Sequence, residues 1–404
     1  MNTHKIKVRD LYVAHPAPLL KAEHLVASLS HDMDEGDLLH LVDRFGRNVG
    51  TAIYGIQPRS IGWVVSKQAL PSLDASFFAH KFANAFSKRI AFLKSPKTNV
   101  FRIFNGEGDG IGGLTVDYYD SHLLISYYNL GIYRYREAIR KAVRQTAEFT
   151  AIVEKKRFGD NQDGEVLGGV FSENLGMPAG EPRETEQTEA RNLPPFICKE
   201  NDVKCWIDLV NGGMTGIFAD QREVRKTIRN KYAKGQRVLN LFSYTAMFSV
   251  FAALGGAKST TNVDLARRSH ELAKANYELN NLSPDAHEFI TGDVFQFLES
   301  AAKSDYRYDL IIIDPPSFSN SSYGTFSSEK GLGKLIEACL KVAHKNSRLV
   351  VSTNNSRISA EKFKKIVSEK LVVLEEFSLP QDYRYAKDVE GSNYLKVAIC
   401  KIKI

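Results

Sequence analysis

The sequence predicts an α/β protein in which a doubly wound parallel sheet forms the C-terminal half, preceded by a small β-rich barrel and an α+β middle region. Three observations predict this fold class. Strand-like and helix-like segments alternate between residues 203 and 352, and short apolar runs separated by turn residues fill residues 37–65. A polar segment at 172–195, dense in Gly, Pro, Glu and Thr, separates the two patterns. At 404 residues the chain has the length expected for two or three domains.

The N-terminal region combines short strands with an aromatic-rich helix. Residues 37–43, 50–55 and 60–65 are short apolar runs, which predict a small barrel or curled sheet. The next segment carries apolar residues at helical spacing with basic residues between them, and we interpret it as a buried stripe with a solvated basic back. A nucleic-acid-binding face is the alternative interpretation. The apolar residues are Phe77, Phe78, Phe82, Phe86, Ile90 and Phe92, and the basic ones are Lys81, Lys88 and Arg89.

A glycine-rich stretch at 101–117 superficially resembles a phosphate-binding loop. It lacks the Lys-Ser/Thr pair of such loops and leads into strand-like residues 114–117 and 123–128 instead of a helix. We therefore expect a tight, hairpin-like connection, followed by a helix at 133–145.

The composition is that of an ordinary folded protein, with 43% hydrophobic and 25% charged residues. From the first residues we expect no signal peptide, and no apolar run approaches the roughly 18 to 20 residues that cross a bilayer. The four cysteines form no Cys-x-x-Cys pair, so we expect reduced thiols in a cytoplasmic protein, without disulfides or a structural metal site. A net charge of +7 favours a polyanionic partner. The cysteines are Cys198, Cys205, Cys339 and Cys400.

The C-terminal half alternates strands with helices, which predicts a parallel sheet whose ligands bind beyond the carboxyl ends of its strands. A further strand-like segment, 203–209, precedes the alternation. The expected strands are 237–241, 259–264, 288–291, 308–314 and 348–352, and the expected helices are 246–255, 266–280, 294–303 and 329–344.

Acidic residues stand at the ends of these strands. Asp264 is placed where nucleotide-binding sheets hold ribose hydroxyls, although such a residue can also cap a helix. The loop that begins at Asn240 has no Gly-x-Gly-x-x-Gly, so a dinucleotide pyrophosphate would lack its glycine cradle. S-adenosylmethionine carries adenosine without phosphate, so it needs an acidic residue for the ribose hydroxyls but no glycine cradle. Asp293 either accepts the adenine amino group or caps the following helix.

The sharpest motif is Asp314-Pro-Pro-Ser-Phe318, directly after an apolar strand. Its two prolines restrict φ and exclude regular structure, which leaves backbone carbonyls to accept hydrogen bonds. We expect Asp314 at the floor of the cleft and Phe318 stacked against a flat ring, as aromatic side chains stack on single bases.

This motif, together with Asn240-Leu-Phe-Ser-Tyr-Thr245 and Phe218-Ala-Asp-Gln-Arg222, resembles the bacterial 23S rRNA methyltransferases that carry an N-terminal PUA-like domain. It also resembles the guanine-N7 half of a related two-domain enzyme. The resemblance spans nearly the whole chain and is strongest at 215–355. It implies a PUA-like RNA-binding barrel at 1–72, an α+β middle domain at 73–180 and a Rossmann-like class I methyltransferase domain at 181–404. It also implies S-adenosylmethionine as cofactor and ribosomal RNA as partner, and it leaves a homodimer open.

The resemblance assigns site residues by position. The implied cofactor-binding residues are Phe218, Asp220, Gln221, Phe242, Ser243, Tyr244, Thr245, Asp264, Leu265, Asp293 and Val294. The implied catalytic residues are Asp314, Pro315, Phe318, Asn354 and Asn355.

Two departures from the family pattern bear on function. Ala246 stands where relatives usually have glycine, so its methyl group either crowds the cofactor or changes the turn. Cytosine-C5 enzymes need a cysteine nucleophile after the fifth strand, but this chain has Val351-Ser-Thr-Asn-Asn-Ser356. Guanine N7 already offers a lone pair, so we expect guanine-N7 methylation. Cytosine-C5 methylation by a distant thiol and a catalytically silent RNA-binding or assembly factor remain alternatives, with a nicotinamide oxidoreductase a distant third.

Overall fold

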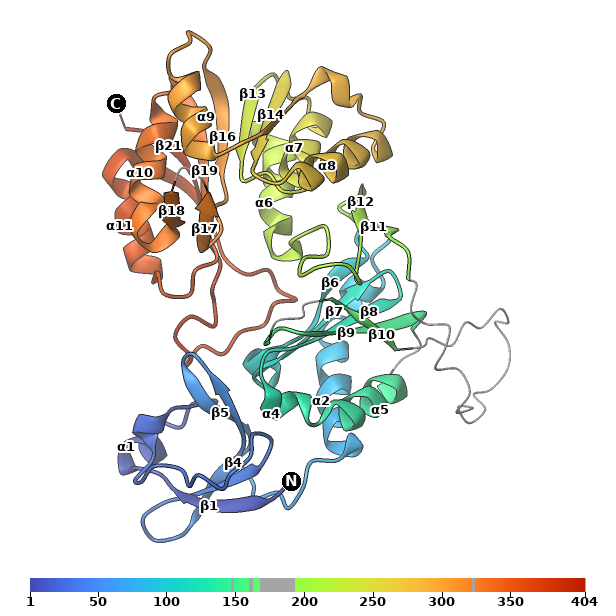
Figure 1. Cartoon of the computed structure of the whole chain (residues 1–404), viewed down its shortest axis with the longest axis vertical. Coiled ribbons are helices and arrows are strands. Elements are labelled where there is room, and N and C mark those ends of the chain that lie inside the picture. The colour runs from blue at the N-terminus through green and yellow to red at the C-terminus, as the bar shows by residue number, and fades with distance from the viewer. Residues whose placement is uncertain (147–148, 160–162, 168–192, 322–323, 404) are drawn as a thin grey trace. The chain divides into compact units, whose positions relative to one another are not determined.

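The computed structural model describes residues 1–146, 149–159, 163–167, 193–321 and 324–403 (Figure 1). The expected linker at 172–195 and the boundary at 180/181 lie largely outside these residues. The chain forms two compact units. Unit 1 contains Met1–Phe196, Asp208–Thr215 and Gln381–Ser392, and unit 2 contains Ile197–Ile207, Gly216–Pro380 and Asn393–Ile404.

Unit 1 begins with a five-stranded sheet in the order β1-β3-β4-β5-β2. Its β1 runs parallel to β3, and the other pairs are antiparallel. The three strands expected from the sequence are confirmed as β3, β4 and β5. The elements are β1 (Thr3–Lys7), α1 (Asp10–Ala14), β2 (Leu19–Leu20), the 3-10 helix η1 (Ala22–His24), β3 (Leu38–Val42), β4 (Asn48–Gln57) and β5 (Ser60–Ser66).

A second sheet in unit 1 has the order β10-β9-β8-β7-β6 and packs with α2 and α5. The glycine-rich stretch is confirmed as a connection between the antiparallel strands β6 and β7. The elements are α2 (Ala75–Ser87), α3 (Ile90–Leu93), β6 (Val100–Asn105), the 3-10 helix η2 (Gly106–Asp109), β7 (Leu114–Tyr119), β8 (His122–Tyr127), α4 (Leu130–Tyr133), α5 (Arg136–Thr146), β9 (Ala151–Lys156) and β10 (Glu165–Leu167).

The aromatic stripe of α2 is buried, as the core interpretation predicted. Phe78, Phe82 and Phe86 belong to one hydrophobic core that also includes Leu38 and Ile53 of the first sheet. The expectation of a solvated basic back is wrong for Arg89, which is fully buried between α2 and α3. The helix breaks there, because the backbone of Arg89 leaves the helical region and its side chain turns inward to an acidic partner.

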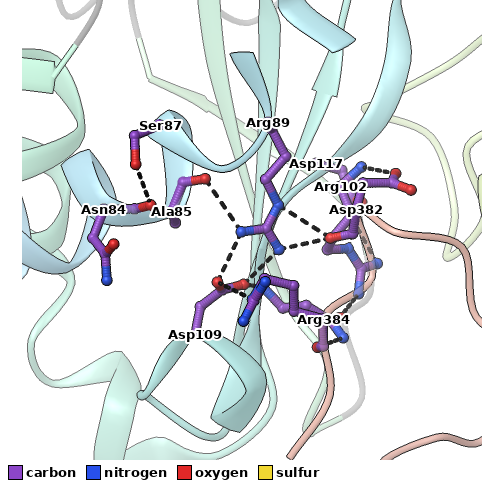
Figure 2. A network of polar contacts seen from close by, with 10 residues as sticks. Asn84, Ala85, Ser87, Arg89, Arg102, Asp109, Asp117, Asp382 and Arg384 are labelled. Carbon is purple, nitrogen blue, oxygen red and sulfur yellow. Dashed lines mark hydrogen bonds and ion pairs between the residues drawn. The ribbon is translucent and has the colours of Figure 1, made fainter. Parts of the chain in front are cut away.

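Arg89 is the centre of a buried polar network (Figure 2). Its guanidinium donates to both carboxylate oxygens of Asp109 at 2.8 and 2.7 Å and to the backbone carbonyl of Asp382 at 2.6 Å. The carboxylate of Asp382 accepts the backbone N–H of Arg102 at 2.9 Å, and Arg102 pairs with Asp117. The segment 381–392 is thereby tied to β6 and η2, although hundreds of residues separate them in sequence.

Unit 2 is built around a seven-stranded sheet in the order β15-β14-β13-β16-β19-β21-β20. The strands from β15 to β19 are parallel, and β21 is antiparallel to both of its neighbours. The strand order reverses between β13 and β16, the position where such sheets bind ligands. The strands are β13 (Arg237–Leu241), β14 (Ser259–Asp264), β15 (Glu288–Thr291), β16 (Tyr308–Ile313), β19 (Ala343–Thr353), β20 (Leu371–Phe377) and β21 (Lys396–Ile402).

Helices and two small hairpins complete unit 2. The helix expected at 329–344 ends at Leu340, because β19 already begins at Ala343 and carries a register shift in its polar first half. Among the described residues, no helix is long and apolar enough to cross a membrane. The elements are β11 (Phe196–Glu200), β12 (Val203–Ile207), η3 (Ala219–Gln221), α6 (Arg222–Thr227), the π-helix η4 (Ile228–Tyr232), α7 (Met247–Leu254), α8 (Arg267–Leu279), η5 (Pro284–Ala286), α9 (Val294–Ala301), β17 (Phe318–Ser321), β18 (Gly324–Ser327), α10 (Ser328–Leu340) and α11 (Ala360–Lys370).

Candidate active site

The candidate site lies at the carboxyl ends of the parallel strands of unit 2. Asp264 is the last residue of β14, and Asp314 directly follows β16. Asp293 comes two residues after β15, and Asn354 directly follows β19. Because neighbouring parallel strands end on the same edge of the sheet, these side chains collect there.

The loop after β13 has an unusual backbone. Phe242, Tyr244 and Ala246 have φ values of 57°, 49° and 57°, in the left-handed region that glycine favours. For residues other than glycine this conformation costs roughly 1–2 kcal/mol each, and it persists only where surrounding contacts enforce it. The methyl group of Ala246 is therefore accommodated in the turn conformation that glycine would take, with the residue fully buried.

Neighbouring segments supply the contacts that hold this loop. The backbone N–H of Tyr244 donates to the Asp264 carboxylate at 2.8 Å, and the Tyr244 hydroxyl accepts the N–H of Gly216 at 2.9 Å. The hydroxyl of Thr245 donates to the Gly216 carbonyl at 2.6 Å, and Asn276 donates to the Thr245 carbonyl at 3.1 Å. Strand β14, helix α8 and the segment before η3 thus determine the loop together.

The Phe-Ala-Asp-Gln segment forms η3 and faces the same loop. Phe218 is 44% exposed, and its ring centroid lies 5.5 Å from that of Tyr244. The carboxylate of Asp220 accepts the hydroxyl of Tyr394 at 2.9 Å. The amide of Gln221 donates to Asp314 Oδ1 at 3.2 Å, so the structure joins the Phe-Ala-Asp-Gln segment to the Asp-Pro-Pro motif.

A buried ion pair supports this segment from beneath. Both carboxylate oxygens of Glu200 accept from Arg225 at 2.7 Å, and Arg225 also donates to the Phe218 carbonyl at 2.8 Å. Glu200 and Arg225 therefore hold the backbone at Phe218 in place. Neither residue was predicted from the sequence, because both stand among other charged residues that give no sign of which one is buried.

Asp314 is an acid of the site whose pKa is raised by its surroundings. It is partly accessible as a residue, while its carboxyl group lies among protein atoms and accepts a hydrogen bond from Ser352. Burial raises the pKa of Asp314 to about 6, and the nearby charge of Asp220 adds to the rise. Hydrogen bonds from Ser352 and Gln221 favour the charged form and therefore oppose this rise in the pKa. The carboxyl group is thus mostly ionised at neutral pH and titrates just below it.

The remaining predicted catalytic residues differ in their exposure to solvent. Phe318 begins β17 with 59% of its surface exposed, whereas Pro315 is buried. Asn354 is exposed, and its side-chain oxygen accepts the hydroxyl of Ser317 at 3.0 Å. The amide of Asn355 is turned inward, where Nδ2 donates to Ser328 at 3.1 Å and Oδ1 accepts from Arg357 N at 2.9 Å.

The other predicted cofactor residues divide into exposed and structural ones. Asp264 Oδ1 also accepts the N–H of Ala266, and Asp293 caps α9 by accepting N–H groups of its first turn at 2.8 and 3.2 Å. Leu265 is 44% exposed. Val294 and the half-buried Phe242 pack in the hydrophobic core, and Ser243 is buried.

Two further residues near the site were not singled out from the sequence. Ser352 binds Asp314, as described above. Lys396 is 9% exposed in β21, pairs in register with Thr353 and donates to the Asn355 carbonyl at 2.9 Å. A lysine at the start of the apolar run Leu395–Cys400 was the signal in the sequence.

Thiols are buried away from the strand ends. Cys339 lies in α10, Cys400 in β21, and Cys198 and Cys205 in the β11–β12 hairpin, all of them buried. Burial raises the pKa of the Cys205 and Cys339 thiols far above the usual range, and that of Cys400 to about 12. Because only the thiolate is nucleophilic, none of these groups is activated.

The fold and this edge of the sheet define a class I methyltransferase that uses S-adenosylmethionine. A family model described as S-adenosylmethionine-dependent methyltransferase matches residues 179–363, and one for a PUA-like domain matches residues 13–67. The Bacillus subtilis (strain 168) protein YwbD, named as a candidate ribosomal RNA large subunit methyltransferase, is 39% identical and aligns with 98% of this chain and 100% of its own. The chain belongs to this family of methyltransferases with an N-terminal PUA-like domain.

More distant relatives and solved structures agree with this assignment. Ribosomal RNA large subunit methyltransferase I of Yersinia pseudotuberculosis (serotype O:1b) is 27% identical, with 93% of each chain aligned. The crystal structure of SMU.776, described as a candidate methyltransferase complexed with SAH, has a TM-score of 0.87 at 35% identity and covers 99% of this chain and 100% of its own. A second structure, from Streptococcus mutans, has a TM-score of 0.85 at the same identity, with the same coverage.

The residues present fit S-adenosylmethionine. Among the described residues, the buried Oγ of Ser243, Oε1 of Gln221 and both amide atoms of Asn240 have no hydrogen-bond partner. Unpartnered buried polar atoms are rare in folded proteins, and these four lie at the first strand end and in the η3 motif. A polar ligand would supply the missing partners. The acidic residues of the same edge suit a cofactor with a positive sulfonium.

Proposed function

We propose that this enzyme methylates a base nitrogen of large-subunit ribosomal RNA, with guanine N7 as the first choice, in the cytoplasm. The observation that carries the choice of atom is the end of β19, where Ser352, Thr353 and Asn354 offer no thiol beside Asp314. A cytosine-C5 reaction requires a thiolate that adds to C6 before the methyl group is transferred. A guanine N7 lone pair needs only correct placement.

The cofactor would lie along the strand ends. Asp264 would accept the ribose hydroxyls, because only one of the two lone pairs on each of its oxygens is used by the backbone N–H groups of Tyr244 and Ala266. Asp293 would contact adenine, and Phe218 with Tyr244 would form one wall. When bound, S-adenosylmethionine supplies an electrophilic methyl group on sulfur.

The target base would be held by Phe318 and Asp314. The exposed ring of Phe318 offers a stacking surface, and the Asp314 carboxylate can accept from the amino and imino groups of guanine. Transfer of the methyl group breaks its bond to sulfur and forms a bond to N7, which leaves the base positively charged. A neighbouring carboxylate stabilises that charge as it develops. Asn354, which is exposed, is better placed for the base than the inward-facing Asn355.

The decisive experiment combines nucleoside analysis with purified protein. We expect a deletion strain to lose 7-methylguanosine from its 23S rRNA, and the protein to restore it on deproteinised RNA with S-adenosylmethionine. Asp314→Asn should reduce transfer by roughly 10²–10³-fold, and Cys339→Ala, at a buried position remote from the strand ends, should keep it. Loss of 5-methylcytidine instead would overturn the choice of N7. A protein that binds no S-adenosylmethionine by calorimetry would support the silent-factor alternative.

A further inference from the structure

The turn between β3 and β4 displays an aromatic ring to solvent. Phe45, at the tip of this turn, is 68% exposed, although large apolar side chains are usually buried. It belongs to the PUA-like part of unit 1, outside the methyltransferase residues described above. Phe45 belongs to none of the hydrophobic cores that the described residues form around the two sheets of unit 1, so its exposure needs another explanation.

The turn is organised in advance by Asp43. This aspartate is 4% exposed, and its Oδ1 accepts the backbone N–H groups of Phe45 and Arg47, both at 2.9 Å. The N–H of Asp43 in turn donates to the Arg47 carbonyl at 2.9 Å, and Gly46 takes a φ of +82° that closes the turn. A turn already fixed in this way presents Phe45 without the ordering cost that a flexible loop would incur on binding.

Two guanidinium groups flank the ring. The guanidinium carbon of Arg44 lies 4.7 Å from the Phe45 ring centroid, and that of Arg47 lies 5.1 Å from it. Both arginine side chains remain largely exposed, at 65% and 74%, although each has an acidic partner, Asp10 and Asp43. Their positive charge is therefore available at the surface beside a flat ring.

Strand β1 adds basic residues next to the turn. Lys5 and Lys7 are both exposed and, two residues apart on the strand, point to the same face. Lys7 pairs in register with Val42, directly before the turn, and Lys5 Nζ would lie 3.8 Å from a Cβ atom added to Gly46. The surface around Phe45 thus has four basic side chains against the two carboxylates of Asp10 and Asp43.

We infer that this turn, Asp43–Arg47, with Lys5 and Lys7, binds an unpaired nucleotide of RNA. The base stacks on Phe45, and the flanking phosphates contact the arginine and lysine side chains. An unpaired nucleotide offers a flat ring and negative charge together, whereas an apolar protein surface would have to desolvate the guanidinium groups and an acidic peptide lacks the ring. The inference rests on the proposed function in that RNA is the substrate, and it adds a second contact with that RNA.

Fluorescence anisotropy of the full chain with a short single-stranded RNA and with a duplex of equal length tests the inference. Phe45→Ala should weaken single-strand binding roughly tenfold and duplex binding much less, and Phe45→Trp should retain affinity. Arg44→Gln and Arg47→Gln should each lower the slope of log affinity against log salt by about 0.7. Ile56→Ala, another exposed apolar residue near a hairpin tip of the same sheet, is the matched control and should change nothing.

The outcomes separate this inference from the proposed function. Wild-type affinity of Phe45→Ala for single-stranded RNA, or an equal loss for both RNAs, overturns the inference even where methyl transfer proceeds normally. A second outcome is that the wild-type protein transfers no methyl group, while Phe45→Ala still binds single-stranded RNA more weakly than the wild type. In that case the proposed function fails and the nucleotide site stands. Circular dichroism spectra and thermal midpoints matching the wild type show that each variant is folded.

Discussion

Arg89 and Asp109 form a two-pronged ion pair inside unit 1, with N–O distances of 2.8 and 2.7 Å and each side chain only 1% exposed. The same guanidinium holds the carbonyl of Asp382, so one buried charge joins α2, η2 and the 381–392 segment (Figure 2). A buried charge is stable only while its partner and hydrogen bonds are complete.

Removal of one member of this pair should therefore destabilise unit 1 strongly. We expect Asp109→Asn to lower the free energy of unfolding by roughly 3–5 kcal/mol, because it leaves the Arg89 charge buried without its counter-charge. Urea denaturation followed by circular dichroism measures this loss. The exposed pair Lys21–Glu23 provides the control, and Glu23→Gln should change stability by less than about 1 kcal/mol. Equal effects of the two substitutions would show that the buried pair has no special role.

The pH dependence of methyl transfer should follow the Asp314 carboxyl group. Its pKa is raised to about 6, so the carboxylate is lost as the pH falls through 6, and kcat/KM should fall tenfold per pH unit below that value. Two variants should move this acid limb of the plot of kcat/KM against pH in opposite directions. Ser352→Ala removes a hydrogen bond to the charged form and should shift the limb to higher pH, whereas Asp220→Asn removes a repelling charge and should shift it to lower pH.

A profile measured with saturating S-adenosylmethionine separates this effect from weaker cofactor binding. Shifts of the same sign in both variants, or no movement in either, would mean that another group controls the acid limb. The Ser352→Thr variant retains the hydroxyl group and should keep the limb at the wild-type position.

Substitutions at Ala246 should test the left-handed loop. Ala246→Gly relieves strain at a φ of +57° but increases the freedom of the unfolded chain, so the free energy of unfolding should change by less than about 1 kcal/mol. Ala246→Val places a β-branched side chain in a conformation it strongly disfavours and should weaken S-adenosylmethionine binding at least tenfold. Calorimetry measures both affinities. An Ala246→Gly variant with much tighter cofactor binding would show instead that the native methyl group crowds the cofactor.

Much of the methyltransferase half could be predicted from the sequence, because its pattern is local. Alternating apolar strands and amphipathic helices report which face of each element is buried, so the parallel sheet and the strand ends at Asp264 and Asp314 followed directly. The position of the helix end at Leu340 did not follow, because the polar residues at the start of β19 carry no strand pattern of their own.

The pairing of charges that lie far apart in the chain could not be predicted from the sequence. Arg89 belongs to a helical pattern and was expected to be solvated, yet its partners are Asp109, 20 residues away, and Asp382, 293 residues away. Nothing in the local spacing identifies such partners, since a charged residue on a helix is usually exposed.

By itself the sequence determined the alternation of strands and helices between residues 237 and 352, the acids at the strand ends and the absence of a cysteine after the fifth strand, but not β20 and β21. Tertiary structure alone decided that Ser352 and Gln221 meet at Asp314, that Asn355 turns inward while Asn354 faces solvent, and that Arg89 is buried. The physical reason is that periodicity records burial within one element. The pKa of an acid and the direction of an amide depend instead on which distant segments fold against them.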